Sequence, residues 1–171
     1  MKTINLLLGN SDRRINNQVE VAVRDVCYDR AVVECYRTAR LDEFIQRGSC
    51  EDFDLILMAP DHLLPGPVRR GSRDPIEEAV RAIRTIKEHR TVPIIGVAVP
   101  AEHELKVLMA GADNVFGAFF NAEVLKSEVR RVLNLAEIAE ETSLAASSRP
   151  SFAETIMRGF DRFKQAVVTK S

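Results

Sequence analysis

Three apolar runs, separated by stretches with the periodicity of amphipathic helices, constrain the fold of this chain most strongly. The runs lie at Ile4–Leu8, Phe53–Pro60 and Val92–Val99. A nearly continuous apolar run indicates a strand that is buried on both faces, and strands that alternate with helices indicate a parallel sheet with helices on both sides. The sequence therefore predicts an α/β fold with Phe53–Pro60 as its central strand.

The remaining pattern completes a set of five strands and five helices. The first strand is predicted to span Thr3–Leu8, and weaker runs at Ala31–Tyr36 and Asn114–Phe119 predict an edge strand and a fifth strand. Residues that commonly cap helices precede four of the helical patterns, and these are Ser11 or Asp12, Thr38 or Asp42, Asp74 and Asn121.

Helix ends and buried faces also follow from the pattern. The first helix is expected to end near Cys27, and Gly48 is expected to close the second. The fourth helix is predicted at Glu102–Ala110. Its inward residues are predicted to be Leu105, Leu108 and Met109, and those of the fifth helix to be Val124, Leu125, Val129, Val132 and Leu133.

Two segments fall outside this alternation. Residues 60–74 are rich in proline and glycine, which predicts an irregular loop that is either a solvated insertion or a binding loop. Residues 142–150 form a small and polar linker, and Ser151 and Glu154 open a final amphipathic helix over residues 151–171. The predicted domain organisation is thus a main domain over residues 1–141, a linker and a C-terminal helical extension.

Composition excludes several classes of protein. The 171 residues include 24 Lys and Arg against 25 Asp and Glu, so no overall field attracts nucleic acid or an anionic membrane. No apolar run reaches the ~20 residues of a membrane span, and the N-terminus lacks the pattern of a signal peptide. Cys27, Cys35 and Cys50 are expected at a helix end, in a strand and in a loop, as idle thiols without metal-ligand spacing. A cytoplasmic protein is the expectation.

The carboxyl ends of the predicted strands carry no obvious chemistry. In parallel sheets the reactive groups gather at these ends, yet here they read Gly9-Asn10, Ala59 and Ala98. Acidic and histidine side chains occur nearby without paired spacing, at Asp12, Asp61, His62 and His103. We therefore expect no enzyme activity, no metal and no cofactor, and we regard an anion site at the Gly9–Ser11 turn as the weaker interpretation.

Three motifs carry a family resemblance over residues 3–135. They are Asp54–Met58 on the third strand, Val92–Ile95 on the fourth and Gly111–Asn114 before the fifth. In this order they resemble the receiver domain of two-component response regulators. The resemblance implies a flavodoxin-like, CheY-like fold with five parallel strands in the order 2-1-3-4-5.

The resemblance also implies a set of lost functions. Receivers take a phosphoryl group on an aspartate that ends strand three, bind Mg²⁺ through an acidic pair after strand one, and contact the phosphoryl oxygens with a Ser or Thr after strand four and a Lys after strand five. At the matching positions this chain has Gly9, Asn10, Ala59, Ala98 and Ala118. The chain thus resembles a degenerate pseudo-receiver that cannot take a phosphoryl group.

The expected role is protein–protein contact in bacterial signal transduction, with a signalling partner, a second copy of the chain, or both. A DNA-binding output is disfavoured because about 36 residues beyond the fifth helix are too few. The resemblance implies a contact face on the fourth helix, fifth strand and fifth helix, which the final helix could extend. Its candidate residues are His103, Lys106, Val107, Val115, Phe116, Ile156, Phe160 and Phe163. The alternative is a ligand-sensing module that binds a small molecule in the vacated pocket beneath residues 60–74.

Overall fold

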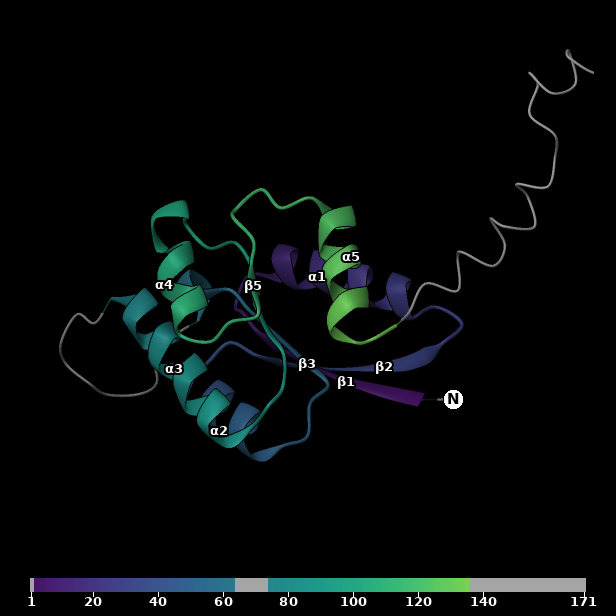
Figure 1. Ribbon diagram of the computed structural model, residues 1–171, viewed down its shortest axis with the longest axis horizontal. Helices are drawn as coiled ribbons and strands as arrows, with labels where there is room; N and C mark the ends of the chain where they lie inside the picture. The colour runs from purple at the N-terminus through teal and green to yellow at the C-terminus, as the bar shows by residue number, and fades with distance from the viewer. Residues whose placement is uncertain (1, 64–73, 136–171) are drawn as a thin grey trace, which may run out of the picture. The chain divides into compact units, whose positions relative to one another are not determined.

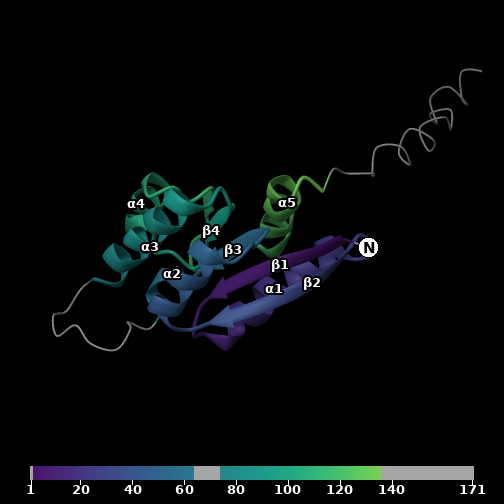
Figure 2. The ribbon, with the colours of Figure 1, turned by 90° about the horizontal axis from the view of Figure 1, so that it is seen from below.

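The fold is built on a five-stranded parallel sheet, seen here in a computed structural model that describes residues 2–63 and 74–135. The strands follow the order β2-β1-β3-β4-β5, as expected. Figure 2 shows the two longest strands, β1 and β2, side by side at one edge. The strand bounds are Lys2–Gly9 for β1, Ala31–Thr38 for β2, Leu55–Met58 for β3, Ile94–Gly96 for β4 and Asn114–Val115 for β5.

Helices cover both faces of this sheet (Figure 1). On one face α1 lies beside α5, and on the other face α2, α3 and α4 form a layer. Two short 3-10 turns, η1 and η2, precede α3 and α4. The bounds are Arg13–Cys27 for α1, Leu41–Cys50 for α2, Pro60–His62 for η1, Pro75–His89 for α3, Ala101–His103 for η2, Glu104–Met109 for α4 and Ala122–Val132 for α5.

The central strands are buried on both faces, as their apolar runs predicted. Leu6 and Leu8 of β1 point into the core beneath α1 and α5, whereas Leu7 points into the core beneath α2 and α3. Ile56 and Leu57 of β3 alternate in the same way, and all five side chains are at most 2% exposed. The period of two along each strand thus separates two apolar cores.

Three of the predicted N-caps are confirmed. Asp12 accepts a hydrogen bond from the backbone N–H of Arg14 at 2.7 Å, and Asp74 and Asn121 cap α3 and α5 in the same way. The prediction for α2 was wrong, because this helix begins after Arg40 and has no side-chain cap. The hydroxyl of Thr38 instead donates to the carboxylate of Glu43 at 2.9 Å.

Gly48 does not close α2, which continues to Cys50. A Cβ atom on Gly48 would lie 2.7 Å from Cδ1 of Ile86, so glycine lets α2 pack closely on α3 without displacing that side chain. The helix ends where the guanidinium of Arg90 donates to the carbonyl oxygens of Ser49 and Cys50, at 3.2 and 2.9 Å. Cys50 therefore lies at an exposed helix end and not in a loop.

The later strands are shorter than the sequence predicted, and Pro60–His62 forms a 3-10 turn where an irregular loop was expected. An apolar run extends beyond its strand when the flanking residues stay buried without pairing. Val97 and Val99 are examples, because both are buried although β4 ends at Gly96. The rest of the proline-rich segment, residues 64–73, lies outside the described residues, as do the predicted linker and final helix.

The predicted inward face of α4 was wrong. Leu105, Leu108 and Met109 are 69%, 41% and 76% exposed, whereas Val107 is completely buried. Gly96 on β4 leaves room for Val107, whose Cγ1 would lie 3.4 Å from a Cβ atom at that glycine. A six-residue helix can turn either of two apolar stripes inward, and contact with the sheet selected the stripe of Val107.

In α5 the predicted face is confirmed in part. Leu125, Val129 and Leu133 are buried beneath the helix, and Val132 is half-buried. Val124 is 52% exposed, contrary to the prediction, because it lies toward the solvent-facing side of the first turn.

Candidate functional site

The turn between β1 and α1 uses its polar groups internally. The side chain of Asn10 is buried, and its Oδ1 accepts a hydrogen bond from the backbone N–H of Asp12 at 2.8 Å. The side-chain amide of Asn16 donates to the carbonyl oxygen of Asn10 at 3.1 Å. The backbone N–H of Asn10 donates to the carbonyl oxygen of Thr38 at 2.9 Å. Asn10 therefore holds the start of α1 against the end of β2, and Oδ1 is engaged within the turn.

An aromatic ring occupies the space beside Gly9. A Cβ atom at this glycine would lie 2.4 and 2.5 Å from two ring carbons of Phe44, which is itself completely buried. A carboxylate could occupy position 9 only if the ring moved. The sequence pattern gave no indication of this contact.

The ends of β1 and β3 are joined by backbone hydrogen bonds. Ala59 is completely buried. Its backbone N–H donates to the carbonyl oxygen of Gly9 at 3.0 Å, and its carbonyl oxygen accepts from the backbone N–H of His62 at 3.0 Å. The carbonyl oxygen of His62 in turn accepts from Ser11 at 2.9 Å. The η1 turn thus closes over the position after β3.

The remaining two positions of the edge also carry only methyl groups. Ala98 is half-buried and has a φ of 55°, which is uncommon for a residue with a Cβ atom. Ala118 is exposed. The five positions Gly9, Asn10, Ala59, Ala98 and Ala118 therefore present no carboxylate, hydroxyl or ammonium group of their own.

The acidic and histidine side chains near this edge do not converge. Asp12 caps α1, and Asp61, His62 and His103 lie on the two 3-10 turns. Within residues 2–63 and 74–135, no three His, Cys, Asp or Glu side chains could together hold a metal ion.

The cysteines are likewise dispersed. Cys27 is buried, and Cys35 is half-buried on β2. Burial and, to a smaller extent, the nearby Glu20 carboxylate raise the pKa of the Cys35 thiol to about 11. A thiol with this pKa stays protonated at neutral pH, so Cys35 is a poor nucleophile.

The predicted contact face is only partly at the surface. Val107 lies in the core, so its side chain is not available for contacts. Val115 and Phe116 are half-buried and pack against opposite cores, Phe116 with its ring 6.4 Å from that of Phe120. His103 is half-buried, and Ile156, Phe160 and Phe163 lie outside the described residues.

Ion pairs connect α4 and α5 to the neighbouring helices. Lys106 of α4 pairs with Glu77 of α3, and Lys126 of α5 pairs with Asp25 of α1 at 2.5 Å. The hydrogen bond with Asp25 raises the pKa of Lys126 and lowers that of Asp25.

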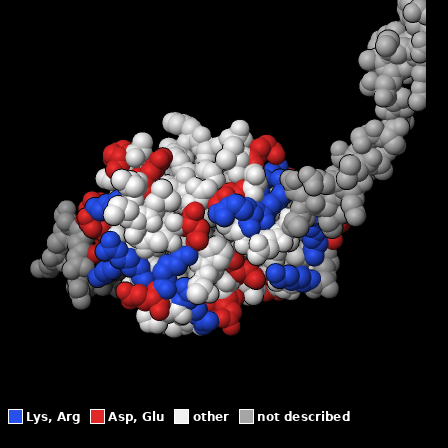
Figure 3. Space-filling view, in the orientation of Figure 1, with Lys and Arg blue, Asp and Glu red and all other residues white. Residues whose placement is uncertain are grey.

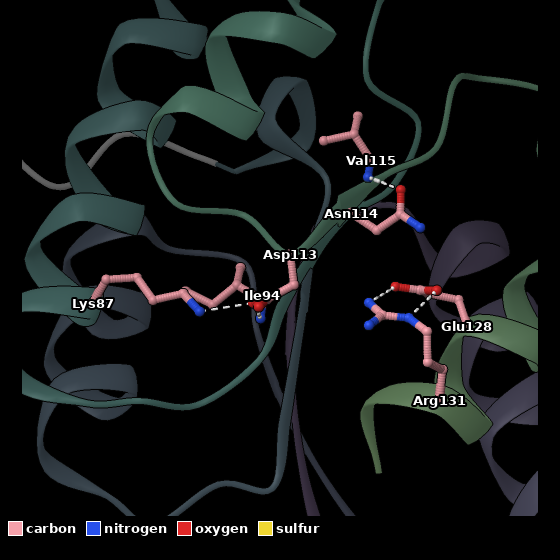
Figure 4. A network of polar contacts seen from close by, with 7 residues as sticks. All are labelled: Lys87, Ile94, Asp113, Asn114, Val115, Glu128 and Arg131. Carbon is pink, nitrogen blue, oxygen red and sulfur yellow. Dashed lines mark hydrogen bonds and ion pairs between the residues drawn. The ribbon is translucent and has the colours of Figure 1, made fainter. Parts of the chain in front are cut away.

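A second polar network lies at the other end of the strands, where β4 and β5 begin (Figure 4). Oδ2 of Asp113 accepts from Nζ of Lys87 at 2.7 Å and from the backbone N–H of Ile94 at 2.8 Å. Nearby, a hydrogen bond from Arg131 lowers the pKa of Glu128. Asp113 belongs to the Gly111–Asn114 turn, and its contacts fix the entry into β4 and β5.

Comparison with known proteins gives the identity of the fold. No family model and no curated protein matches the chain. Solved structures do match. The receiver domain of the sensor histidine kinase PA1611 from Pseudomonas aeruginosa, which holds a magnesium ion in its active-site cleft, has a TM-score of 0.58 at 18% identity, with 77% of this chain and 98% of that chain covered. The chain has the receiver-domain fold.

Other solved structures have the same fold. A putative response regulator from Chloroflexus aurantiacus has a TM-score of 0.58 at 19% identity, with coverage of 78% and 99%. A putative pilus assembly protein, cpaE, from Burkholderia thailandensis has a TM-score of 0.54 at 21% identity, with coverage of 77% and 98%. The similarity extends over nearly the full length of each of the three matched structures. No helix within the described part of this chain is long and apolar enough to cross a membrane.

Proposed function

We propose that this chain is a pseudo-receiver, a receiver-fold protein that takes no phosphoryl group and acts through protein contacts in a cytoplasmic signalling pathway of a bacterium. The observation that carries this proposal is the Phe44 ring packed on Gly9. A receiver needs a carboxylate at that position to help hold a divalent cation, and here an aromatic side chain fills the space.

The other positions of the edge support the same conclusion. Phosphoryl transfer to a carboxylate requires an acceptor and positive charge to stabilise the phosphoryl oxygens. Ala59, Ala98 and Ala118 supply neither, and Asn10 is engaged in the β1–α1 turn. Restoring a single group would leave the others absent, so the loss concerns the whole site. The chain is accordingly proposed to have no enzymatic activity.

The direct test is phosphorylation of the full-length protein. Incubation with acetyl phosphate and Mg²⁺, followed by intact mass analysis, should show no added phosphoryl group. The Ala59→Asp variant should also stay unmodified, because Gly9, Asn10, Ala98 and Ala118 are unchanged. A stoichiometric, hydroxylamine-labile adduct on the wild-type chain would overturn the proposal.

Magnesium binding provides an independent measurement. The PA1611 receiver domain is a suitable positive control, since its structure holds the ion in the active-site cleft. Millimolar Mg²⁺ should raise the melting temperature of that control beyond the effect of matched ionic strength. For this chain we expect no such increase.

A further inference from the structure

One long strand edge of the sheet has no neighbour. β2 pairs with β1 along all eight of its residues and is the last strand in the order β2-β1-β3-β4-β5. Within residues 2–63 and 74–135 no strand pairs with its outer side, and Figure 2 shows β2 as the outermost strand. The opposite edge of the sheet, β5, is only two residues long. An unpaired strand with the length of β2 is a template for pairing with another chain.

The free backbone groups of β2 belong to every second residue. The carbonyl oxygen of Thr38 accepts a hydrogen bond from the N–H of Asn10, which follows β1, so the backbone of Thr38 points toward β1. Backbone groups of successive residues in a strand point to opposite sides. The N–H and carbonyl groups of Val33, Cys35 and Arg37 therefore point outward.

The side chains along this edge are complementary to each other. The hydroxyl of Tyr36 donates to Oε2 of Glu34 at 3.1 Å, and the guanidinium of Arg47 on α2 lies 5.7 Å from the centre of the Tyr36 ring. One face of β2 thus carries an exposed carboxylate and, two residues further on, a hydroxyl beside a cation. On the other face, Arg37 pairs with Glu20 of α1, which neutralises its charge.

We propose that β2 pairs in antiparallel orientation with β2 of a second copy of this chain, about a two-fold axis at Cys35. In this register Cys35 lies opposite its own equivalent, and Val33 lies opposite Arg37 of the second copy. These are the residues whose backbone groups point outward, so they can form the hydrogen-bonded pairs of an antiparallel ladder. The two sheets would become one continuous sheet.

The choice of register follows from the side chains between these pairs. With the axis at Cys35, Glu34 of each copy lies opposite Tyr36 of the other and close to its Arg47, and the symmetry makes this contact twice. With the axis at Glu34, the two Glu34 carboxylates would lie directly opposite each other, which is unfavourable. Charge complementarity therefore favours a second copy in the Cys35 register.

The same features favour a closed dimer over a longer assembly. Each copy has one long strand edge, so pairing through β2 consumes it and leaves only the two-residue edge of β5. The net charge is −1, and Figure 3 shows positive and negative side chains interspersed over the face in view. Long-range repulsion between two copies is therefore weak. The inference goes beyond the proposed function and does not depend on the loss of phosphorylation.

The test measures the mass of the full-length chain by sedimentation equilibrium. Arg37→Pro removes an N–H that points outward and keeps the donors that face β1, as at natural edge prolines. Arg37→Ala is the matched control, because it also loses the ion pair with Glu20 but keeps the N–H. Circular dichroism checks that both variants are folded.

We expect a dimer for the wild type and for Arg37→Ala. For Arg37→Pro the dissociation constant of the dimer should rise at least about tenfold. A monomeric wild type, a dimer that persists in Arg37→Pro, or an equal loss in both variants would overturn the proposal.

A second pair of variants tests the register and decides the matter if Arg37→Pro does not fold. Glu34→Lys would place an ammonium group near Arg47 of the other copy, so it should weaken the dimer at least about tenfold. Glu88→Lys makes the same change in net charge at an exposed position of α3 and should leave the dimer unchanged. Equal dissociation constants for these two variants would exclude the proposed contact.

Other modes of self-association give different results. If Phe160→Ser with Phe163→Ser dissociates the dimer and Arg37→Pro does not, the final segment is the assembly element and the proposal is wrong. The same holds if Leu105→Ser with Met109→Ser is the variant that dissociates it. No phosphoryl donor is present in these measurements, so a failure here is distinguishable from a failure of the pseudo-receiver assignment.

Discussion

The ring of Phe44 lies against the α-carbon of Gly9, where α2 meets the end of β1. This contact makes residue 9 a packing position. The absence of a side chain there allows Phe44, the largest fully buried side chain among residues 2–63 and 74–135, to close the sheet at the carboxyl end of β1.

Gly9→Ala should therefore destabilise the fold. The added methyl group would meet the ring at about 2.5 Å, and overpacking of this kind costs about 1–3 kcal/mol. Denaturant unfolding of the variant should show a lower midpoint with an unchanged slope. Gly117→Ala is the matched control, because its methyl group would make only ordinary contacts, at 3.5 Å and beyond. Equal stability of the wild type and Gly9→Ala would show that the ring moves aside without cost.

Ala98→Gly should stabilise the protein. Ala98 has a φ of 55°, a left-handed conformation that costs a residue with a Cβ atom about 1–2 kcal/mol. Glycine removes this strain but gains entropy in the unfolded chain, so the net increase in the free energy of unfolding should be about 0.5–1 kcal/mol. Ala98→Val should lower the same quantity, since branching at Cβ makes this conformation still less favourable. Thermal unfolding of both variants tests the ordering, and a stabilising valine would contradict it.

Asp113 should matter more for its bond to the backbone than for its ion pair. Asp113→Ala leaves the N–H of Ile94 without its carboxylate acceptor, which should cost about 1–3 kcal/mol. Lys87→Ala removes only a partly exposed ion pair and should cost less than about 1 kcal/mol. Asp113→Asn keeps an oxygen acceptor for Ile94, so its loss of stability should lie between those of Asp113→Ala and Lys87→Ala. Equilibrium unfolding would refute this account if Lys87→Ala were the most destabilising of the three.

Glu20 should contribute stability that depends on pH. Burial on its own raises the pKa of Glu20, but hydrogen bonds from Arg37 and Arg24 outweigh burial and hold the pKa below its usual value of 4.5. Because the pKa is lower in the folded state, the contribution is present above the unfolded-state pKa and is lost as the pH falls through the folded-state value.

Glu20→Gln should accordingly lower the free energy of unfolding at pH 7 by up to about 1 kcal/mol, and the difference from wild type should shrink as the pH falls below 4.5. Glu88→Gln, at an exposed position of α3, serves as the control and should show no such trend. An effect of Glu20→Gln that is constant across this pH range would exclude ionisation as its cause.

The sheet could be predicted from the sequence because its signals are local and agree with one another. The apolar runs fix β1, β3 and β4, and Asp12, Asp74 and Asn121 start their helices where cap chemistry predicts. These residues act within a few positions of themselves.

The Phe44–Gly9 contact and the orientation of α4 could not be predicted in this way. The first joins residues from two elements that meet only in the folded chain, and neither residue signals the other in sequence. In α4, Leu105, Leu108 and Met109 form a better apolar stripe than Val107 and Ala110. The sheet and α3 nevertheless contact the second stripe. Periodicity identified the helix, but packing decided which side faces inward.

The single buried side chain of α4 also has a consequence for its motion. A helix of six residues that is anchored mainly through Val107 gains little from staying folded, so it should open locally at a lower free energy than the 15-residue helix α3, which buries six residues. In native-state hydrogen exchange, the backbone amides at the end of α4 should therefore exchange sooner than those in the middle of α3. The helix that exposes Leu105, Leu108 and Met109 would then also change shape more readily than α3.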